Sequence, residues 1–315
     1  MSAKFTLDVT ILEPKRKHPT IFEHFDQLQP KESFIIHNDH DPKPLYYQLL
    51  AERGQCFNWT YLLSGPEIWE VKIQKRDTEN AETIGKLSAA DYRKAQVFKN
   101  FGLNFSCHGQ KTIDEACAEK QVDPNSVKKA LHEITSKEDI ALNYNDWSLT
   151  LLISFIIHRH HLYVKTHLPE LLQLSHNFSL NTSDAALKKI EQLTIILEKE
   201  LSAHLHKEEV ILFPYITALT KFEDNPESIT SFGFSTINTP VNVMMTEHES
   251  ADEIIAEIQK TLQQIQEPQQ YNRQLDFYRE SLKAFADDLD THIHLENNIL
   301  FPKAIALEKE LLIRD

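Results

Sequence analysis

The fold is decided by a stretch of sequence that occurs twice. HLHKEEVILFP runs from His204 to Pro214, and HIHLENNILFP runs from His292 to Pro302. Both copies hold His, Glu, Ile-Leu-Phe and Pro at the same offsets. In a helix, residues i and i+4 share one face and lie roughly 6 Å apart. Each copy can therefore present an imidazole nitrogen and a carboxylate oxygen to the same metal ion.

Two more histidines follow the period of this repeat. His161, His204, His248 and His292 lie 43, 44 and 44 residues apart, which places one histidine on each helix of a repeated two-helix hairpin. A single His-x-x-x-Glu is often only a surface ion pair, but two copies with the same tail favour a metal site. The candidate ligands are His161, His204, Glu208, His248, His292 and Glu296. This mixed nitrogen and oxygen set suits iron, with carboxylates able to bridge two ions, whereas zinc more often gathers its ligands at a single ion.

Neighbouring histidines compete for these roles. His158 and His160 lie close to His161, and spacing alone does not decide among the three. His206 and His294 follow the first ligand of each copy by two residues, so they point about 200° away and cannot share its metal. We expect both to face solvent or to lie behind the ligands.

The sequence around the repeat predicts a mainly α protein of three parts. From Trp147 onward, apolar residues recur at three- and four-residue spacing, which indicates four long helices at about 147–174, 183–221, 239–266 and 271–309. Together they predict a four-helix bundle over residues 146–315.

Short helices and a small sheet precede the bundle. Residues 84–140 predict a helical module, with a capping box at Thr112 and Glu115 and a helix that ends at Gly102. Residues 1–77 predict an α+β domain of order β-α-β-α-β-β, whose first helix opens at Pro19 and whose second helix is capped by Asp41. Polar stretches at 76–82 and 137–145 predict linkers.

Composition excludes several classes of partner. The formal net charge of -14 argues against nucleic acid and against an anionic membrane surface. The three cysteines form no Cys-x-x-Cys, so a disulfide framework is not expected and a reducing cytoplasm fits best. The N-terminus shows no signal peptide, and the most apolar run, Leu149–Ile157, is too short to span a bilayer.

At these residues the chain resembles the YtfE/ScdA family of di-iron iron–sulfur cluster repair proteins. The similarity covers about residues 86–315 and is carried by His-Arg-His-His161, Leu201-Ser-Ala-His204-x-x-x-Glu208-Glu, Thr246-Glu-His248-Glu and Asp290-Thr-His292-x-x-x-Glu296-Asn-Asn. It selects His161 from its neighbours. It implies a hemerythrin-like bundle that holds two non-haem iron ions, bridged by carboxylates and, when oxidised, by an oxo or hydroxo group.

The resemblance extends to residues outside the ligand set. Glu200 and Glu247 match family carboxylates near the metals that are thought to form a polar path, with ordinary surface charge as the equal alternative. The family usually shows Cys-Cys-Gly-Gly where this chain has Ser106-Cys107-His108-Gly109, so a vicinal cysteine pair is excluded. Cys107 is a candidate redox or transfer thiol if the loop exposes it, and a buried structural role is the somewhat favoured alternative. Cys117 is expected to lie in a core.

The first domain resembles a small family related to the TusA-type sulfur carriers. Those proteins carry sulfur on a Cys-Pro at the start of the first helix, and this chain has His18-Pro19 there. Persulfide transfer by that route is therefore excluded.

The family resemblance implies repair of iron–sulfur clusters damaged by nitrosative or oxidative stress, with damaged iron–sulfur proteins as partners. Two mechanisms stay open: donation of iron, and reduction of nitric oxide to nitrous oxide, which would make the chain an enzyme. The sequence shows no electron donor for the second. A hemerythrin-like protein that binds oxygen or nitric oxide reversibly, without turnover, is the alternative from another class. Association into a homodimer is left open.

Overall fold

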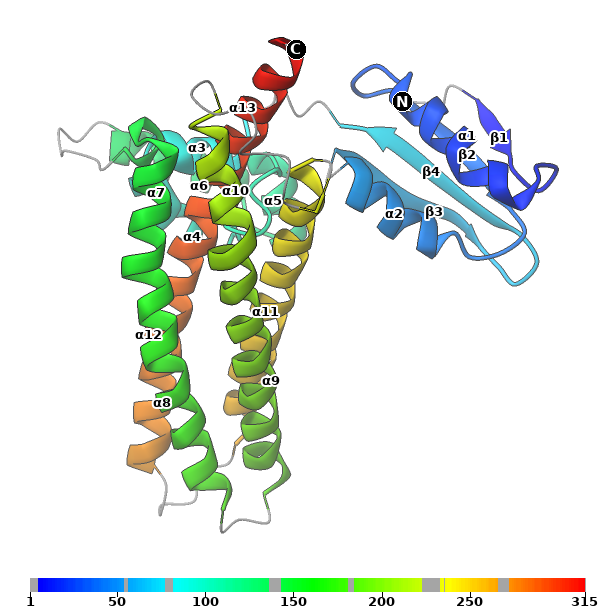
Figure 1. Cartoon of the computed structure of the whole chain (residues 1–315). Coiled ribbons are helices and arrows are strands. Elements are labelled where there is room, and N and C mark those ends of the chain that lie inside the picture. The colour runs from blue at the N-terminus through cyan, green and yellow to red at the C-terminus, as the bar shows by residue number, and fades with distance from the viewer. Residues whose placement is uncertain are drawn as a thin grey trace. The chain divides into compact units, whose positions relative to one another are not determined.

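The computed structural model describes residues 5–53, 56–76, 82–135, 143–180, 184–222, 233–234, 236–265 and 272–314. The chain divides into two compact units, Met1–Glu82 and Thr83–Asp315 (Figure 1). Most of each predicted linker, at 76–82 and 137–145, lies outside the described residues. The finer division at 77, 84, 140 and 146 stays a prediction.

The first unit is a four-stranded sheet with two helices. Along the chain its elements are β1 (Thr6–Asp8), α1 (Pro14–Asp26), β2 (Ser33–Asn38), α2 (Lys43–Arg53), β3 (Phe57–Ser64) and β4 (Trp69–Lys75). The strands lie in the order β1-β2-β4-β3, with β1 parallel to β2 and the other pairs antiparallel. The β-α-β-α-β-β order predicted from the sequence is confirmed.

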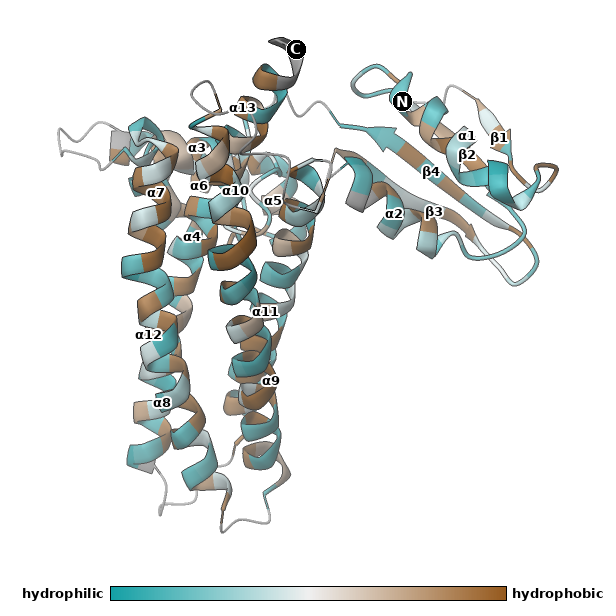
Figure 2. Ribbon diagram, in the orientation of Figure 1, coloured by the Kyte–Doolittle hydropathy of each residue, from teal (hydrophilic) through white to brown (hydrophobic). Residues whose placement is uncertain are grey.

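Both helices cover the same face of this sheet. Phe34 and Ile36 of β2 pair with Ile73 and Val71 of β4, and all four side chains are buried on one face. The buried side chains of α1 and α2 belong to the same apolar cluster. Figure 2 shows the expected alternation of brown and teal along β4. The unit therefore has one core between the sheet and its helices.

The predicted start of the first helix is wrong by five residues. α1 begins at Pro14, and Pro19 lies inside the helix. Pro14 takes the first-turn position, where a missing N–H has no helical partner to lose. Asp41 behaves as predicted, because its Oδ1 accepts a hydrogen bond from the Lys43 N–H at 3.0 Å at the start of α2.

The second unit begins with four short helices. These are α3 (Ile84–Ala90), α4 (Tyr92–Asn100), α5 (Ile113–Lys120) and α6 (Pro124–Thr135). The predicted capping box is present, with the Thr112 side chain and the Glu115 side chain each bonded to the other's backbone. Gly102 follows α4 with a φ of 68°, a conformation that glycine adopts without strain. Figure 1 shows these helices gathered at one end of the bundle.

Four long helical columns make up the bundle, as predicted. The first joins α7 (Leu149–Phe155) to α8 (Leu162–Ser179), the second joins α9 (Ala185–Lys207) to α10 (Phe213–Leu219), the third is α11 (Asn238–Gln264), and the fourth joins α12 (Asn272–Leu295) to α13 (Phe301–Arg314). Across the described part of the chain, no helix combines the length and apolarity that a bilayer span requires.

The bundle has two separate apolar cores. One core contains Leu197, Ile258 and Leu282, from the long stretches of α8, α9, α11 and α12. The other contains Ile216 and Phe301, from α7, α10, α13 and the first turns of α11. The histidines of the repeat lie between the two cores along every column. The candidate ligands therefore occupy a polar layer that crosses the bundle.

Candidate metal centre

Three of the four columns contain a π-helical turn at a candidate ligand. These turns span Ile156–His161, Glu208–Leu212 and Glu296–Leu300. A π turn is rare and is often found at functional sites. Pro214 and Pro302 follow the last two turns, and proline cannot donate the i→i−4 bond of a regular α-helix. The repeated Phe-Pro is thus the sequence signal for the widened turns, which the helical periodicity alone does not reveal.

All six candidate ligands are buried, each with 1 % or less of its surface exposed. They form two groups of four, in which ligand atoms lie within 4.8 Å of one another. One group contains His161 and His292, and the other contains His204 and His248. Glu208 and Glu296 belong to both groups. The two groups of potential ligand atoms are therefore adjacent and have both carboxylates in common.

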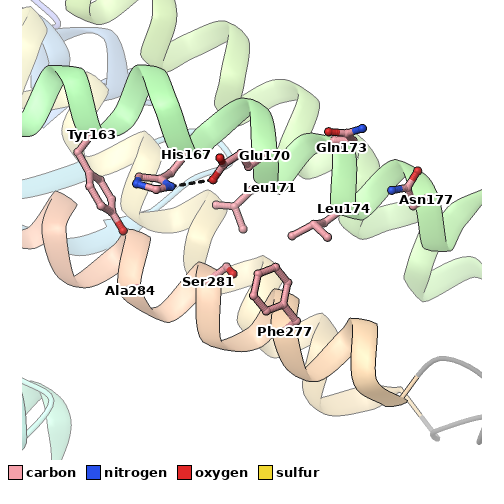
Figure 3. A pocket seen from close by; sticks show the side chains of 10 residues that line it. All are labelled: Tyr163, His167, Glu170, Leu171, Gln173, Leu174, Asn177, Phe277, Ser281 and Ala284. Atoms are coloured by element: carbon pink, nitrogen blue, oxygen red, sulfur yellow. Dashed lines mark hydrogen bonds and ion pairs between the residues drawn. The ribbon is translucent and has the colours of Figure 1, made fainter.

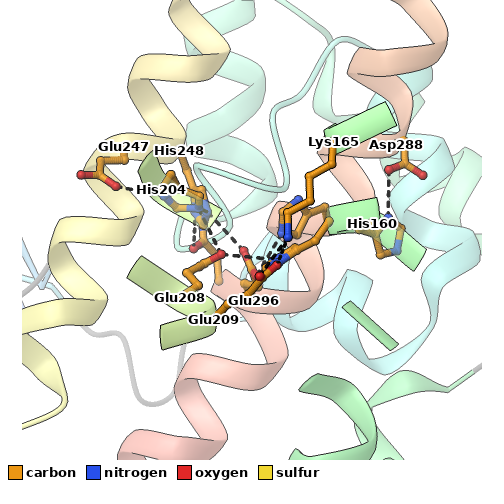
Figure 4. A network of polar contacts seen from close by, with 12 residues as sticks. His160, Lys165, His204, Glu208, Glu209, Glu247, His248, Asp288 and Glu296 are labelled. Carbon is orange, nitrogen blue, oxygen red and sulfur yellow. Dashed lines mark hydrogen bonds and ion pairs between the residues drawn. The ribbon is translucent and has the colours of Figure 1, made fainter. Parts of the chain in front are cut away.

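The individual distances agree with shared carboxylates (Figure 4). Glu296 presents Oε1 to the Nε2 of His292 at 3.0 Å and Oε2 to the Nε2 of His248 at 3.2 Å. The Oε2 of Glu208 lies 3.3 Å from the Nε2 of His204 and 3.4 Å from the Nε2 of His161. Each carboxylate therefore faces one histidine from each group.

Several of the candidate donor atoms are unsatisfied within the protein. Among the described residues, the buried atoms without a hydrogen-bond partner include both carboxylate oxygens of Glu208, Oε2 of Glu296 and Nε2 of His161. Burying such atoms without a partner is costly. Two imidazole nitrogens with two carboxylate oxygens in each group fit a divalent transition metal.

In the protein without metal, protonated histidines balance the charge of the buried carboxylates in this layer. Burial alone would lower the pKa of His204, but Glu208, and after it Glu247 and Glu296, raise it to about 10. Glu208 and Glu296 outweigh burial at His161 and raise its pKa to about 9. Burial and Glu296 oppose ionisation of Glu208, yet His204 and His161 lower its pKa to about 2. Two imidazolium groups thus neutralise two carboxylates where metal ions would otherwise do so.

Residues behind the ligands orient three of the imidazoles. Nδ1 of His161 donates to Oε1 of Glu209 at 2.7 Å, and Nδ1 of His204 donates to Oε2 of Glu247 at 3.0 Å. Such contacts fix the tautomer, leave Nε2 free for the metal and raise ligand basicity. Lys165 and Lys207 each pair with the carboxylate on their own side. The third imidazole, of His248, donates to an amide oxygen.

That amide belongs to Asn297, whose Oδ1 lies 3.0 Å from Nδ1 of His248. The sequence pattern assigned no role to Glu209 or Asn297. Both were visible as the residue after a bridging glutamate, Glu208 or Glu296, in each copy of the repeat. Glu247 lies beside a ligand as the resemblance implies.

The remaining predicted carboxylate lies farther out. Glu200 is exposed, one turn before His204, and accepts a hydrogen bond from the Ser250 hydroxyl at 3.0 Å. A place for Glu200 or Glu247 in a proton path stays a prediction.

The histidines that neighbour the candidate ligands in the sequence lie outside the ligand cluster. His161 lies in the ligand cluster, whereas His158 is exposed and His160 is buried with its Nδ1 3.1 Å from Oδ2 of Asp288. His206 is exposed, as expected. His294 does not face solvent: it is fully buried, and burial lowers its pKa to about 3.

Of the two alternatives for Cys107, the structure has the buried one. Its surface is 2 % exposed and it packs in the bundle core that contains Leu197. Burial, followed by the nearby acidic residues, raises the pKa of its thiol well above the usual value. The loop folds inward because the Asn104 side chain accepts the Cys107 N–H at 2.9 Å. Cys117 is buried in the core of the short helices, as expected.

A groove of about 600 Å³ lies between α8 and α12 (Figure 3). Tyr163, Leu171 and Phe277 line it, together with the hydrogen-bonded pair His167 and Glu170 at 2.8 Å. None of the six candidate ligands lines this groove. The chemistry of the site therefore resides in the buried layer.

Comparisons with known proteins agree with this geometry. Residues 152–304 match the model of the hemerythrin HHE cation-binding domain. Residues 80–135 match ScdA_N, a domain of unknown function (DUF542), and residues 6–75 match an uncharacterised conserved protein family (DUF2249). The helical bundle and its buried His/Glu layer agree with this match to a hemerythrin-type cation-binding domain, and two smaller matched regions precede it.

Curated relatives are more specific. The iron–sulfur cluster repair protein YtfE of Citrobacter koseri is 28 % identical over 229 residues, which cover 72 % of this chain and 98 % of that protein. The proteins of the same name from Escherichia coli O8 and Escherichia fergusonii match with the same identity and coverage. The chain is thus similar over 229 residues to the YtfE iron–sulfur cluster repair proteins, and residues 6–75 match the separate DUF2249 family. The predicted resemblance is confirmed, and the likeness of the first domain to sulfur carriers stays a prediction.

Proposed function

We propose that the chain holds a di-iron centre and serves in the repair of damaged iron–sulfur clusters. The observation that carries the proposal is the pair of four-residue groups that share Glu208 and Glu296. A site for one ion needs only one such group. Two groups with common carboxylates support two ions held at bridging distance, with His161, His204, His248 and His292 as the terminal ligands.

The donor set favours iron over the common alternatives. Zinc sites usually gather three or four ligands around one ion, and calcium and magnesium take oxygen ligands almost entirely. Four imidazoles with two carboxylates match neither pattern. When bound, the two irons would supply redox chemistry and open positions for a small ligand such as nitric oxide or oxygen.

The protein's own contribution is to fix the ligands before metal arrives. Glu209, Glu247 and Asn297 hold three imidazoles with Nε2 directed inward. The two apolar cores exclude water above and below the layer. Lys165 and Lys207 neutralise the outer carboxylates at the surface. A rigid, dry site of this kind keeps its geometry through changes of ligand and charge.

Two routes to repair remain within the proposal. In the first, iron is the cargo and passes from the layer to a damaged cluster. In the second, the centre removes nitric oxide by reducing it to nitrous oxide, with electrons from a separate donor. The names of the relatives support the repair role without deciding between the routes.

The test loads the full chain anaerobically with ferrous iron, then counts iron and measures two outputs. One is iron delivery to an apo-ferredoxin; the other is nitrous oxide after addition of nitric oxide and a reductant. Two irons per chain and either output support the proposal. Reversible binding of nitric oxide or oxygen, with neither output, would show a sensor or carrier instead.

A matched pair of variants checks the site. His204→Ala removes a ligand, whereas His206→Ala removes an exposed histidine two residues away. Iron content should fall only in the first. Equal iron content in both would refute the ligand assignment.

A further inference from the structure

The loop between α4 and α5 packs directly onto the two residues after the bridging glutamate Glu296. The side-chain amide of Asn297 donates to the backbone carbonyl of Ser106 at 3.3 Å, and the amide of Asn298 donates to the carbonyl of Phe105 at 3.0 Å. Asn297 is only 9 % exposed. The loop of the short-helix domain therefore contacts the residues after Glu296 through its backbone carbonyls.

The same Asn297 contacts a candidate ligand with its other end. Its Oδ1 accepts the N–H of Nδ1 of His248 at 3.0 Å. An asparagine amide donates only from its nitrogen and accepts only at its oxygen. The opposite orientation would place the oxygen of Asn297 against the carbonyl of Ser106. The Ser106 carbonyl therefore fixes the amide, and the amide fixes the tautomer of His248 with Nε2 facing Glu296 at 3.2 Å.

In the first copy of the repeat, a different contact holds the residue that hydrogen-bonds to the ligand histidine. Glu209, the residue after Glu208, accepts the N–H of His161 and is held by Lys165 of the bundle itself. At the equivalent position, Asn297 is held by Ser106 from the short-helix domain. The two halves thus differ in what holds the residue behind the ligand.

We propose that Asn297 is a positioning residue through which the short-helix domain stabilises metal held by His248. The inference rests on the proposed metal centre. Removing a partner of this kind typically weakens metal affinity by about 10- to 100-fold. Docking of the short helices and retention of the metal near His248 are then coupled properties.

A tight packing contact offers a second way to disturb the same arrangement. The Asn298 side chain lies between the backbones of Gly85 and Gly109. A Cβ on Gly109 would meet Oδ1 of Asn298 at 2.1 Å and the carbonyl oxygen of Phe105 at 2.9 Å. Gly109→Ala must therefore shift the Asn298 side chain or the loop backbone at Phe105, although it substitutes neither a ligand nor Asn297.

The experiment measures iron release from the full chain, loaded anaerobically with ferrous iron, to a chromogenic ferrous chelator. Asn297→Ala should release one of its two irons roughly 10- to 100-fold faster than wild type. Gly109→Ala should change the release in the same direction. Asn125→Ala, at an exposed asparagine of α6, is the matched control and should behave as wild type. Thermal melts of the metal-free variants check that each is folded.

The outcomes test separately the positioning role of Asn297 and its coupling to the short-helix domain. Wild-type release from Asn297→Ala, in a folded protein, overturns the positioning role. Fast release from Asn297→Ala with wild-type release from a folded Gly109→Ala overturns the coupling to the short-helix domain. A wild-type chain that never holds two irons refutes the proposed centre itself and leaves the hydrogen bonds of Asn297 without a metal to act on.

Discussion

Asp252→Asn is expected to stabilise the second unit at neutral pH. Asp252 lies on α11, where its Oδ2 accepts a hydrogen bond from the Asn104 amide at 2.9 Å. Burial, and after it the charge of Asp290, raises the pKa of Asp252 to about 6 from 3.8. Ionisation of Asp252 therefore costs the folded state free energy at pH 7. The substituted amide keeps an acceptor for Asn104 and carries no charge.

The magnitude is set by the pKa shift. A shift of one unit corresponds to about 1.4 kcal/mol, so the charge costs at most about 3 kcal/mol, and solvent screening at this partly exposed group reduces the figure to roughly 1–3 kcal/mol. Because the folded-state pKa is raised, the cost reaches its full value above about pH 7 and disappears as the pH falls towards 4. For a domain of this size the gain corresponds to roughly 2–4 °C in Tm per kcal/mol.

The assay is thermal unfolding of the metal-free chain and its variant at several pH values between 4 and 8. The difference in Tm should be largest above pH 7 and should vanish near pH 4. Glu280→Gln, which removes an exposed charge from α12, is the control and should change Tm little at any pH. A gain that is equal at pH 4 and pH 8, or a loss at neutral pH, would refute the argument from burial.

Four other predictions concern the metal layer, the buried thiol and the first unit. Glu208→Ala should abolish binding of both metal ions, because both ligand groups use Glu208, whereas His204→Ala should preferentially lose one; metal analysis checks both. Although burial opposes it, the neighbouring carboxylates raise the pKa of His161 to about 9 and that of His204 to about 10, so metal binding at pH 7.5 should release about two protons, measured by calorimetry in buffers of different ionisation enthalpy. Cys107 should resist thiol reagents in the native protein and react only on unfolding, as a timed titration would show. Residues 1–77 should fold alone, with a melting temperature that does not respond to iron.

The metal layer could be predicted from the sequence because its geometry is local. His204 and Glu208 share a helix face at four-residue spacing, and so do His292 and Glu296. The regular interval between the four histidines equals the length of one bundle helix and its connection to the next, so each helix carries one of them. The spacing within the sequence is therefore enough to assign these six residues to four helices of one bundle.

The residues behind the ligands depend on features that helical periodicity does not contain. A π turn adds a residue to the helix and rotates the next turn of the helix by about 100°. Glu209 and Asn297 lie inside such turns, so a regular helical wheel misplaces them. The burial of Cys107 has a different origin, because it depends on docking between segments that are distant in the sequence. The local sequence predicted a loop at Cys107, but only the packing of this loop on the bundle determines that the Cys107 side chain is buried.

The polar layer between the two apolar cores also determines how the helices align along their axes. Apolar side chains specify alignment weakly, since a slide of one turn, about 5.4 Å, often exchanges one aliphatic group for another. Buried polar groups specify it strongly, as single asparagines do in coiled coils. A one-turn slide of α9 would move His204 away from His248 and would move Glu208 away from the imidazole of His161. The layer therefore fixes the position of each helix along the bundle axis. We expect the four columns to be aligned before any metal ion binds.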